Sequence, residues 1–311
     1  MTDAIDITAY DALFSSRTTA EDWARIVNFR SRPHFLDGVR RHQGVMAPFF
    51  AHNLILNKVV AEVWRFQMLV IMLYLDASRD PADPRSGLTL ANMQNQCAQL
   101  GLASPGRVFA FVNIMKLGRY LSSARSLLDN RVIHLHPTTQ FLATVEEWNG
   151  KIFASIDAAH PEAKLVARAA QYPTLGLGMR TSGAEGLIAG WKPLDPFPEA
   201  FHFAAVDGGW LLMEHIVAAA LQEPTTVRIT PVKLNMSAMS QQFGGSRSNL
   251  RRLLESGYEL GLLDSPPNGG ANVVFSARMT CSFITFIASF LSYFEDHSVI
   301  ALARIEAAGT G

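Results

Sequence analysis

The chain repeats one order of sequence elements after an offset of 143 residues, from Met93 to Met236. This shift superposes Met93 on Met236, Leu100 on Phe243, Gly101 on Gly244 and Gly118 on Gly261. A local slip of one residue adds Ser104 on Ser246, Val108 on Leu250, and Phe111 and Val112 on Leu253 and Leu254. Self-similarity at a fixed offset indicates a repeated structural unit. We therefore expect two copies of one module fused in a single chain.

Length and composition agree with two ordinary domains. A chain of 311 residues that is 49% hydrophobic and 17% charged can bury two substantial cores. Its 27 basic and 27 acidic side chains cancel, which excludes a protein that coats nucleic acid through net charge. Any contact with DNA must come from a local basic face.

Cysteine use and the apolar runs favour the cytoplasm. Cys97 and Cys281 are too few for a disulfide framework and neither lies in a CxxC spacing. The N-terminal "MTDAIDITAYDALF" carries acids where a secretory signal carries bases. The runs "FQMLVIMLYL" and "CSFITFIASFLSYF" are shorter than the roughly 20 residues that cross a bilayer. We expect buried helices there, a cytoplasmic protein and no membrane partner.

Apolar periodicity predicts a mainly helical chain. It indicates helices at Glu21–Phe29 and at about 51–75, 138–158, 201–220 and 280–305. The long helices are expected to form a shared central interface. The predicted divisions are an N-terminal helical extension (1–44), a domain that holds the first copy (45–168), a Gly/Pro-rich linker (169–200) and a domain that holds the second copy (201–311).

The first copy reads as a helix-turn-helix. Leu90, Met93, Cys97 and Leu100 recur at spacings of three and four, and Gly101 suits a left-handed turn. Ser104 is a good N-cap and Pro105 suits the first helical position. The helix that follows is expected to bury Val108, Phe111, Val112 and Met115, and to show Gly106, Arg107, Phe109, Ala110 and Asn113 to solvent.

A recognition helix requires this division of faces, because its outer side chains reach base edges and phosphates in the major groove. Arg107 suits guanine or phosphate, Asn113 suits adenine, and Phe109 suits a thymine methyl group.

A basic hairpin is expected after that helix, with one strand from Tyr120 and Leu121 and a return strand through Val132, Ile133 and Leu135. Arg125 and Arg131 lie in the connection, where an arginine can enter the minor groove. Asp129, two residues before Arg131, is placed to orient it through a charge-assisted pair.

The segment "LTLANMQNQCAQLGLASPGRVFAFVNIMKLGRYLSSARSLLDNRVIHLHPT" resembles the winged-helix core of the MarR family of bacterial regulators, including the Asp-x-Arg of the wing at Asp129 and Arg131 and the following Thr138. The resemblance covers about 50 residues. It implies dimers with interlocked terminal helices, recognition helices in successive major grooves, and release of DNA by a small, frequently aromatic ligand.

The second copy departs from this pattern. Its helix is capped by Ser246 and displays Arg247, Arg251, Arg252 and Glu255, a more basic face than in the first copy. Its wing, "SPPNGGANVVF", has a hairpin turn at Asn268-Gly269 but no arginine or lysine. The first copy thus keeps the charged wing and the second keeps the basic helix.

Several motifs favour a structural interpretation. His134 and His136 share a strand face as metal ligands can, but no third ligand is near, so polar wing residues are favoured and no metal is expected. Cys97 fits a small core residue better than a redox sensor. "GLGMRTSG" is not preceded by an apolar strand, which excludes a dinucleotide site.

Two further groups of residues are interpreted in the same way. Aromatic residues that could line a cavity between the halves fit a core equally well; they are Trp64, Phe66, Trp148, Phe153, Trp191, Phe203 and Trp210. No nucleophile motif is recognisable, so we expect neither an enzyme nor a cofactor.

The sequence therefore predicts a mainly α fold with small β-wings and two winged helix-turn-helix domains in a pseudo-two-fold, dimer-like arrangement, active as a monomer. The expected function is a bacterial-type transcriptional regulator that binds double-stranded DNA at an asymmetric operator. Two alternatives stay open. One is a winged-helix scaffold for protein interaction without DNA binding. The other is a plasmid-type replication initiator, a class that tends to be more basic.

Overall fold

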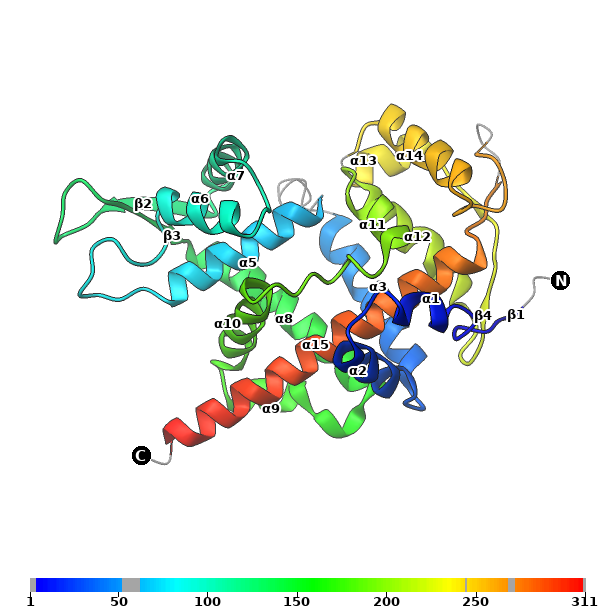
Figure 1. The fold of residues 1–311 in the computed structure, drawn as a ribbon, viewed down its shortest axis with the longest axis horizontal. Coiled ribbons are helices and arrows are strands. Elements are labelled where there is room, and N and C mark those ends of the chain that lie inside the picture. The colour runs from blue at the N-terminus through cyan, green and yellow to red at the C-terminus, as the bar shows by residue number, and fades with distance from the viewer. Residues whose placement is uncertain (1–3, 52–61, 244, 268–271, 310–311) are drawn as a thin grey trace. The chain divides into compact units, whose positions relative to one another are not determined.

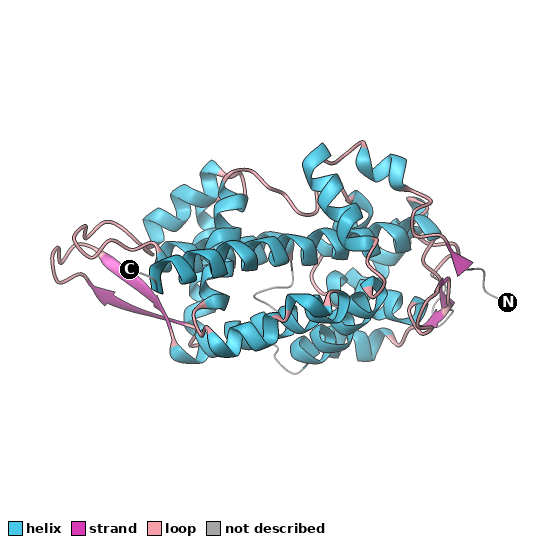
Figure 2. Ribbon diagram, turned by 90° about the horizontal axis from the view of Figure 1, so that it is seen from below, coloured by secondary structure: helices cyan, strands magenta, loops and turns pink. Residues whose placement is uncertain are grey.

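A computed structural model describes residues 4–51, 62–243, 245–267 and 272–309. Of these residues, 64% lie in helices, and the strands form small two-stranded antiparallel sheets that pair β1 with β4, β2 with β3 and β5 with β6. Figure 2 shows short strands among longer helices, and β2 and β3 follow each other along the chain as a hairpin. The predicted mainly α fold with a small share of β structure is confirmed, whereas the two winged helix-turn-helix domains and their pseudo-two-fold arrangement stay predictions.

The chain divides into two compact units, and each unit is discontinuous in sequence. The first-copy unit comprises Val63–Gly150, Ala169–Trp191 and Asp296–Gly311. The second-copy unit comprises Met1–Glu62, Lys151–Arg168 and Lys192–Glu295. Each unit takes segments from both halves of the chain, whereas the sequence predicts contiguous domains. A linear pattern carries no information on which distant segment covers a given helix, so the predicted boundaries stay predictions.

The first-copy unit is built around the first helix-turn-helix (Figure 1). Its elements are α5 (Val63–Ala77), α6 (Leu90–Gln99), α7 (Pro105–Leu117), β2 (Leu121–Arg125), β3 (Ile133–Pro137), the start of α8 (Thr139–Ala159), α10 (Leu175–Ile188) and the end of α15 (Ala277–Gly309). Helix α5 packs against both α6 and α10. Met68, Ile71, Met93 and Phe111 are fully buried or nearly so and form its core.

The second-copy unit holds the remaining elements. They are β1 (Ala4–Ile5), α1 (Asp11–Ser15), α2 (Ala20–Arg30), α3 (Phe35–Ala51), the end of α8, η1 (Pro161–Ala163), the start of α9 (Leu165–Gln171), α11 (Pro198–Ala204), α12 (Gly209–Ala220), β4 (Val227–Arg228), β5 (Val232–Lys233), α13 (Met236–Phe243), α14 (Arg247–Glu259), β6 (Asn272–Val273) and most of α15. Helix α2 contains the predicted Glu21–Phe29 helix. Helix α3 packs against α12 and α13.

The expected continuous helix at 201–220 is wrong, because two helices, α11 and α12, replace it. Gly208 adopts a left-handed conformation with φ of 79°. At Gly209 a Cβ atom would lie 2.2 Å from the carbonyl oxygen of Phe203, so only glycine fits this turn. The apolar spacing continues across the turn and conceals it.

The segment predicted as a linker at 169–200 contains helix α10, and "GLGMRTSG" lies inside it. Its glycines are packing positions. A Cβ at Gly176 would lie 2.5 Å from Asn149 Nδ2, and one at Gly178 would lie 2.9 Å from the Cβ of Ala301. Glycine in this segment permits close packing of helices. The high glycine content was therefore a wrong indication of an irregular linker.

The apolar runs are buried helices, as predicted. In α5, Met68, Leu69, Ile71, Met72 and Leu73 are buried, while residues 52–61 of the expected 51–75 helix lie outside the described residues. Within the described part of the chain, α15 is the one helix long and apolar enough to cross a membrane, and 83% of its most apolar window is buried by the protein itself. Length and composition alone do not assign it to a bilayer.

Candidate nucleic-acid interface

The first helix-turn-helix has the predicted local geometry. The side chain of Ser104 accepts a hydrogen bond from the backbone N–H of Arg107 at 3.4 Å, and Pro105 is the first residue of α7. Gly101 has φ of 65°, and the N–H of Leu102 donates to the carbonyl of Cys97 at 2.9 Å. The predicted inward residues of α7 are all buried: Val108, Phe111, Val112 and Met115.

The outer face of α7 is exposed but weakly charged. Arg107, Phe109 and Asn113 are exposed, and Phe109 keeps 53% of its surface in solvent. The guanidinium of Arg107 lies over the indole of Trp64 on α5, 5.6 Å from the ring centroid. A cation held over a ring is pre-oriented, so α7 presents one fixed positive charge near its N-terminus.

The hairpin expected after α7 is present, but the placement of Arg125 in its connection is wrong, because Arg125 ends strand β2 and pairs with Ile133. Strands β2 and β3 pair from Leu121 with Pro137 to Arg125 with Ile133. The carboxylate of Asp129 accepts from Nε and Nη2 of Arg131, both at 3.0 Å, and from its backbone N–H. These hydrogen bonds lower the pKa of Asp129. The Arg131 side chain is 84% exposed, so Asp129 orients a guanidinium that stays available.

Strand β3 also contacts the residues that precede α6. His134 forms a β-bridge with Thr89, and the N–H of Leu135 donates to the carbonyl of Leu88 at 2.9 Å. The rings of His134 and His136 are 6.2 Å apart on one strand face, and burial lowers the pKa of His134. No group of three or more metal-ligating side chains occurs among the described residues.

The second copy has the same topology. Ser246 caps α14 by accepting from the N–H of Asn249 at 3.2 Å, and Leu250, Leu253 and Leu254 face inward. The strand pairs also correspond. The pairing of Val232 with Val273 is equivalent to the bridge between Thr89 and His134 in the first copy. The bridge between Leu263 and Phe275 is equivalent to the pairing of Leu121 with Pro137.

The helix that follows each wing also begins in the same way. Thr138 accepts from the N–H of Phe141, and Ser276 accepts from the N–H of Met279, each at 3.3 Å. The two copies therefore share one order of helices, bridges and caps.

One equivalence drawn from the sequence is wrong by a residue. The left-handed residue after α7 is Arg119, with φ of 58°, and the one after α14 is Gly261, with φ of 68°. Tyr120 donates to Met115 as Leu262 donates to Gly257, both at 2.8 Å. Gly261 therefore corresponds to Arg119, not to Gly118, because the one-residue slip between the copies persists through α7 and α14. Gly244, which was matched with Gly101, and the hairpin turn predicted at Asn268-Gly269 lie outside the described residues.

The outer face of α14 carries three exposed guanidinium groups. Arg251 pairs with Glu255 at 2.9 Å, and Nη2 of Arg252 donates to Asn249 at 2.6 Å. The side chain of Arg247 forms no ion pair with any described residue. These exposed pairs are weak in water and release the arginines readily to a stronger anion.

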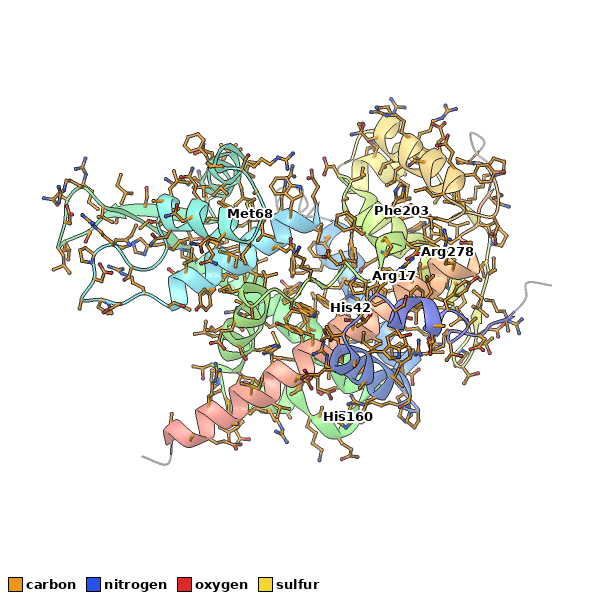
Figure 3. The ribbon with its side chains drawn as sticks, in the orientation of Figure 1. Arg17, His42, Met68, His160, Phe203 and Arg278 are labelled. Carbon is orange, nitrogen blue, oxygen red and sulfur yellow. The ribbon has the colours of Figure 1, made fainter. Side chains whose placement is uncertain are left out.

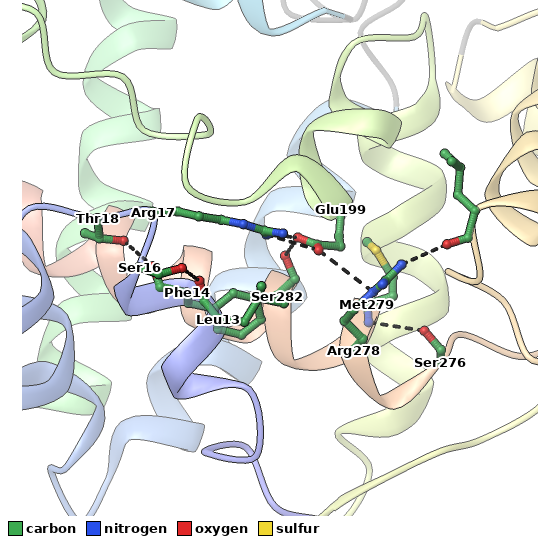
Figure 4. A network of polar contacts seen from close by, with 11 residues as sticks. Leu13, Phe14, Ser16, Arg17, Thr18, Glu199, Ser276, Arg278, Met279 and Ser282 are labelled. Atoms are coloured by element: carbon green, nitrogen blue, oxygen red, sulfur yellow. Dashed lines mark hydrogen bonds and ion pairs between the residues drawn. The ribbon is translucent and has the colours of Figure 1, made fainter.

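A network of polar contacts, which the sequence did not reveal, fixes the C-terminal end of α14 (Figure 4). Buried Glu199 on α11 accepts from Arg17 at 3.1 Å and from Ser282 at 3.2 Å, and lies 3.8 Å from Nε of Arg278. Nη2 of Arg278 in turn donates to the carbonyl of Leu260 at 2.8 Å. These partners are far apart in the chain, so no local pattern could have indicated them.

A second group that sequence reasoning missed is the buried polar pair of His42 and Glu214. His42, labelled in Figure 3, lies on α3, and its Nε2 is 3.9 Å from Oε1 of Glu214 on α12. Among the described residues, both Glu214 oxygens and His42 Nδ1 lack a hydrogen-bond partner. Burial raises the pKa of Glu214 to about 8 and lowers that of His42 to about 4. The indole of Trp210 lies near the carboxyl group but outside hydrogen-bond geometry.

Of the seven aromatic candidates two are buried in a core, and the other five are half-buried: Trp64, Phe66, Trp148, Trp191 and Trp210. Phe153 and Phe203 are the buried ones. The ring centroid of Phe66 lies 5.8 Å from that of Trp148, and the ring centroid of Trp210 lies 5.7 Å from that of Phe283, each pair within one unit. Cys97 and Cys281 are buried, and burial raises their thiol pKa values to about 11 and about 12. The core interpretation of Cys97 is confirmed.

Comparison of the chain with models of known families, with curated proteins and with solved structures finds no match. Two features of the structure bear on function: the capped helices with exposed arginines, and the wing that presents Arg131.

Proposed function

We propose that the chain is a transcriptional regulator that binds double-stranded DNA through two diverged winged-helix modules, within a single polypeptide that acts as a built-in dimer. The observation that supports this proposal most strongly is the repeated order of bridge, capped helix, left-handed turn and wing, in which each outer surface carries arginines. A capped helix with an exposed basic side suits a major groove, and a wing with an exposed arginine suits the adjacent minor groove.

The two modules contribute charge in different places. In the first copy the cations are Arg107 on the helix and Arg125 and Arg131 on the wing, whereas in the second they are Arg247, Arg251 and Arg252, all on the helix. Identical modules would read a palindrome. Diverged modules are expected to bind an asymmetric operator, which a footprint with unequal contacts on the two half-sites would support.

The test is selection of bound fragments from the source genome, followed by affinity measurements over a range of salt concentrations. Arg131→Ala and Arg247→Ala should each reduce the slope of log affinity against log salt by about one unit, since each removes one phosphate contact. Arg304→Ala is the matched control, because this exposed arginine pairs with Glu185 on α10, outside both modules. Unchanged slopes for both module variants would contradict DNA binding.

Release of the DNA by a small aromatic ligand, which the MarR resemblance implies, is part of the proposal. It is tested by adding such compounds to the bound complex and following dissociation.

A protein-interaction scaffold is the second candidate function. It is favoured by the exposed apolar side chains of Phe109 and Leu117 on α7, 53% and 86% exposed, and by the pairing of Arg251 with Glu255. A replication initiator makes the same kind of DNA contact, and would select fragments from a replication origin instead of promoters. Capture of no fragment, with a flat salt response, would favour the scaffold.

A further inference from the structure

The tip of the first wing presents two leucines to solvent. Leu127 is fully exposed and Leu128 is 65% exposed, in the connection between β2 and β3. We call them the wing-tip leucines. Single exposed apolar side chains are common on protein surfaces, but two adjacent leucines at the end of a hairpin form a small apolar surface.

Hydrogen bonds hold this tip in a defined shape. The N–H of Ser126 donates to the carbonyl of Val132, and the N–H of Val132 donates to the carbonyl of Asp129, both at 2.9 Å. The side chain of Ser126, which is buried, accepts from the N–H of Leu128 at 3.2 Å. The leucines are therefore displayed by an ordered turn.

Positive charge flanks the apolar tip. Arg125 ends β2 and its Nη1 donates to the carbonyl of Asn130 at 3.3 Å, while Arg131 is held by Asp129 on the other side of the turn. This small apolar surface between two guanidinium groups is complementary to a minor groove, where stacked bases lie between two phosphate backbones. A purely apolar protein surface offers nothing to these cations.

We propose that the wing-tip leucines insert as a wedge into the minor groove and partly unstack a base step, so that the first module binds bent DNA. This proposal rests on the proposed function and deepens it by naming the DNA feature that is recognised. Unstacking costs least at pyrimidine–purine steps, so such a step is expected under the wing. The second wing, from Ser265 to Phe275, contains no leucine, lysine or arginine, so the bend is confined to one half of the site.

The experiment uses the full-length protein and a fragment obtained by selection, labelled at both ends for energy transfer and carrying 2-aminopurine at the step under the wing. The variant is the double substitution Leu127→Ser and Leu128→Ser. Leu177→Ser is the matched control, because Leu177 is a 44% exposed leucine on α10, outside the winged module.

For the wild type we expect a bent duplex and increased 2-aminopurine fluorescence. The double variant should lose both signals and about tenfold in affinity, because the apolar contact that offsets unstacking is gone. Its salt slope should equal that of the wild type, since leucines contact no phosphate. The control should match the wild type in every measurement.

Three results would overturn the proposal, and they separate its failure from that of DNA binding. If the wild type binds with a normal salt slope and the double variant bends DNA equally well, only the wedge fails. If the wild type shows no salt-dependent binding, the proposed function fails with it. If the wild type self-associates and the leucine substitutions abolish this without changing DNA binding, the leucines form a protein contact instead.

Discussion

The α6–α7 pair and the α13–α14 pair share a serine cap and a left-handed residue at the end of the second helix, yet their surroundings differ. In the first copy the second helix of the pair, α7, is held by apolar packing and by the Arg107 guanidinium over the indole of Trp64. In the second copy it is steadied by polar contacts, with Arg278 donating to Leu260 and His202 lying 3.0 Å from Ser256. Backbone caps define the shared shape, while side-chain contacts around them are free to diverge.

The same contrast appears one helix earlier. At the offset of 143 residues, Ile71 on α5 corresponds to Glu214 on α12. Ile71 is fully buried among apolar residues, whereas Glu214 is equally buried beside His42 with unsatisfied oxygens. The second copy therefore contains a costly polar core position where the first contains an ordinary apolar one.

The largest expected effect comes from a glycine that only the second copy requires. Gly209→Ala would force a Cβ to within 2.2 Å of the Phe203 carbonyl. We expect it to destabilise the second-copy unit by more than about 5 kcal/mol, since backbone must move. Hydrogen exchange should accelerate in α12–α14 and not in α5–α7. Gly106→Ala on α7, where a Cβ meets nothing within 4 Å, is the control and should stabilise by up to about 1 kcal/mol.

The second expected effect is a pH dependence caused by Glu214. Its pKa is about 8 in the folded protein and 4.5 ordinarily, so its stabilising contribution is complete below pH 4.5 and is lost as the pH rises through 8. The full loss is about 5 kcal/mol. Glu214→Gln should remove it, leaving the variant more stable than the wild type at pH 8.5 by urea denaturation. Equal stability loss in both proteins between pH 5 and pH 8.5 would rule out this role.

His42 works in the opposite direction and serves as an internal check. Its pKa is about 4 in the folded protein against 6.5 ordinarily. Its contribution is therefore present above pH 6.5 and is lost as the pH falls towards 4. Glu214→Gln should leave this acid limb in place.

A smaller effect is expected from the polar contacts that hold the end of α14. Arg278→Met leaves the carbonyl of Leu260 without its donor and Glu199 without one cation, which should cost about 1–2 kcal/mol. Hydrogen exchange should report the loss at the C-terminal end of α14. The corresponding residue of the first copy is Gln140, which is exposed, so Gln140→Met should change stability by less than about 0.5 kcal/mol. Similar losses in both variants would mean that the network does not distinguish the copies.

The smallest effects test what the copies share. Ser104→Ala and Ser246→Ala each remove one helix cap and should each cost about 1 kcal/mol in thermal or urea denaturation. Aspartate at either position should restore the stability, because it accepts the same hydrogen bond. A cost confined to one variant would show that the two caps are not equivalent.

Local features were predictable from the sequence. The serine caps, the turn at Gly101, the buried face of α7 and the Asp129–Arg131 pair all depend on neighbours within a few residues, where spacing determines contact. The exposed arginines of α14 followed from the same periodicity. These are the residues of the candidate interface, and most of its geometry was therefore accessible.

Contacts between distant segments were not predictable. The ion pairs of Glu199 with Arg17 and Arg278 depend on which helices pack together. The periodicity of apolar residues along one helix carries no such information. The glycines of α10 were interpreted as a linker for the same reason. A glycine that permits helix packing and a glycine that ends a helix cannot be told apart in the sequence. The break at Gly208 was hidden because apolar spacing matched on both sides.

The interleaving of the two units also bears on how the chain reaches its folded state. Strand β1, at residues 4–5, pairs with residues 227–228, and α5 requires α10 from the later half to cover it. During synthesis the N-terminal segments must therefore wait for partners that emerge much later. High sequence separation of contacts slows folding, so completion is expected to follow release of the whole chain. Expressing either half alone would leave apolar helix faces bare and prone to aggregate.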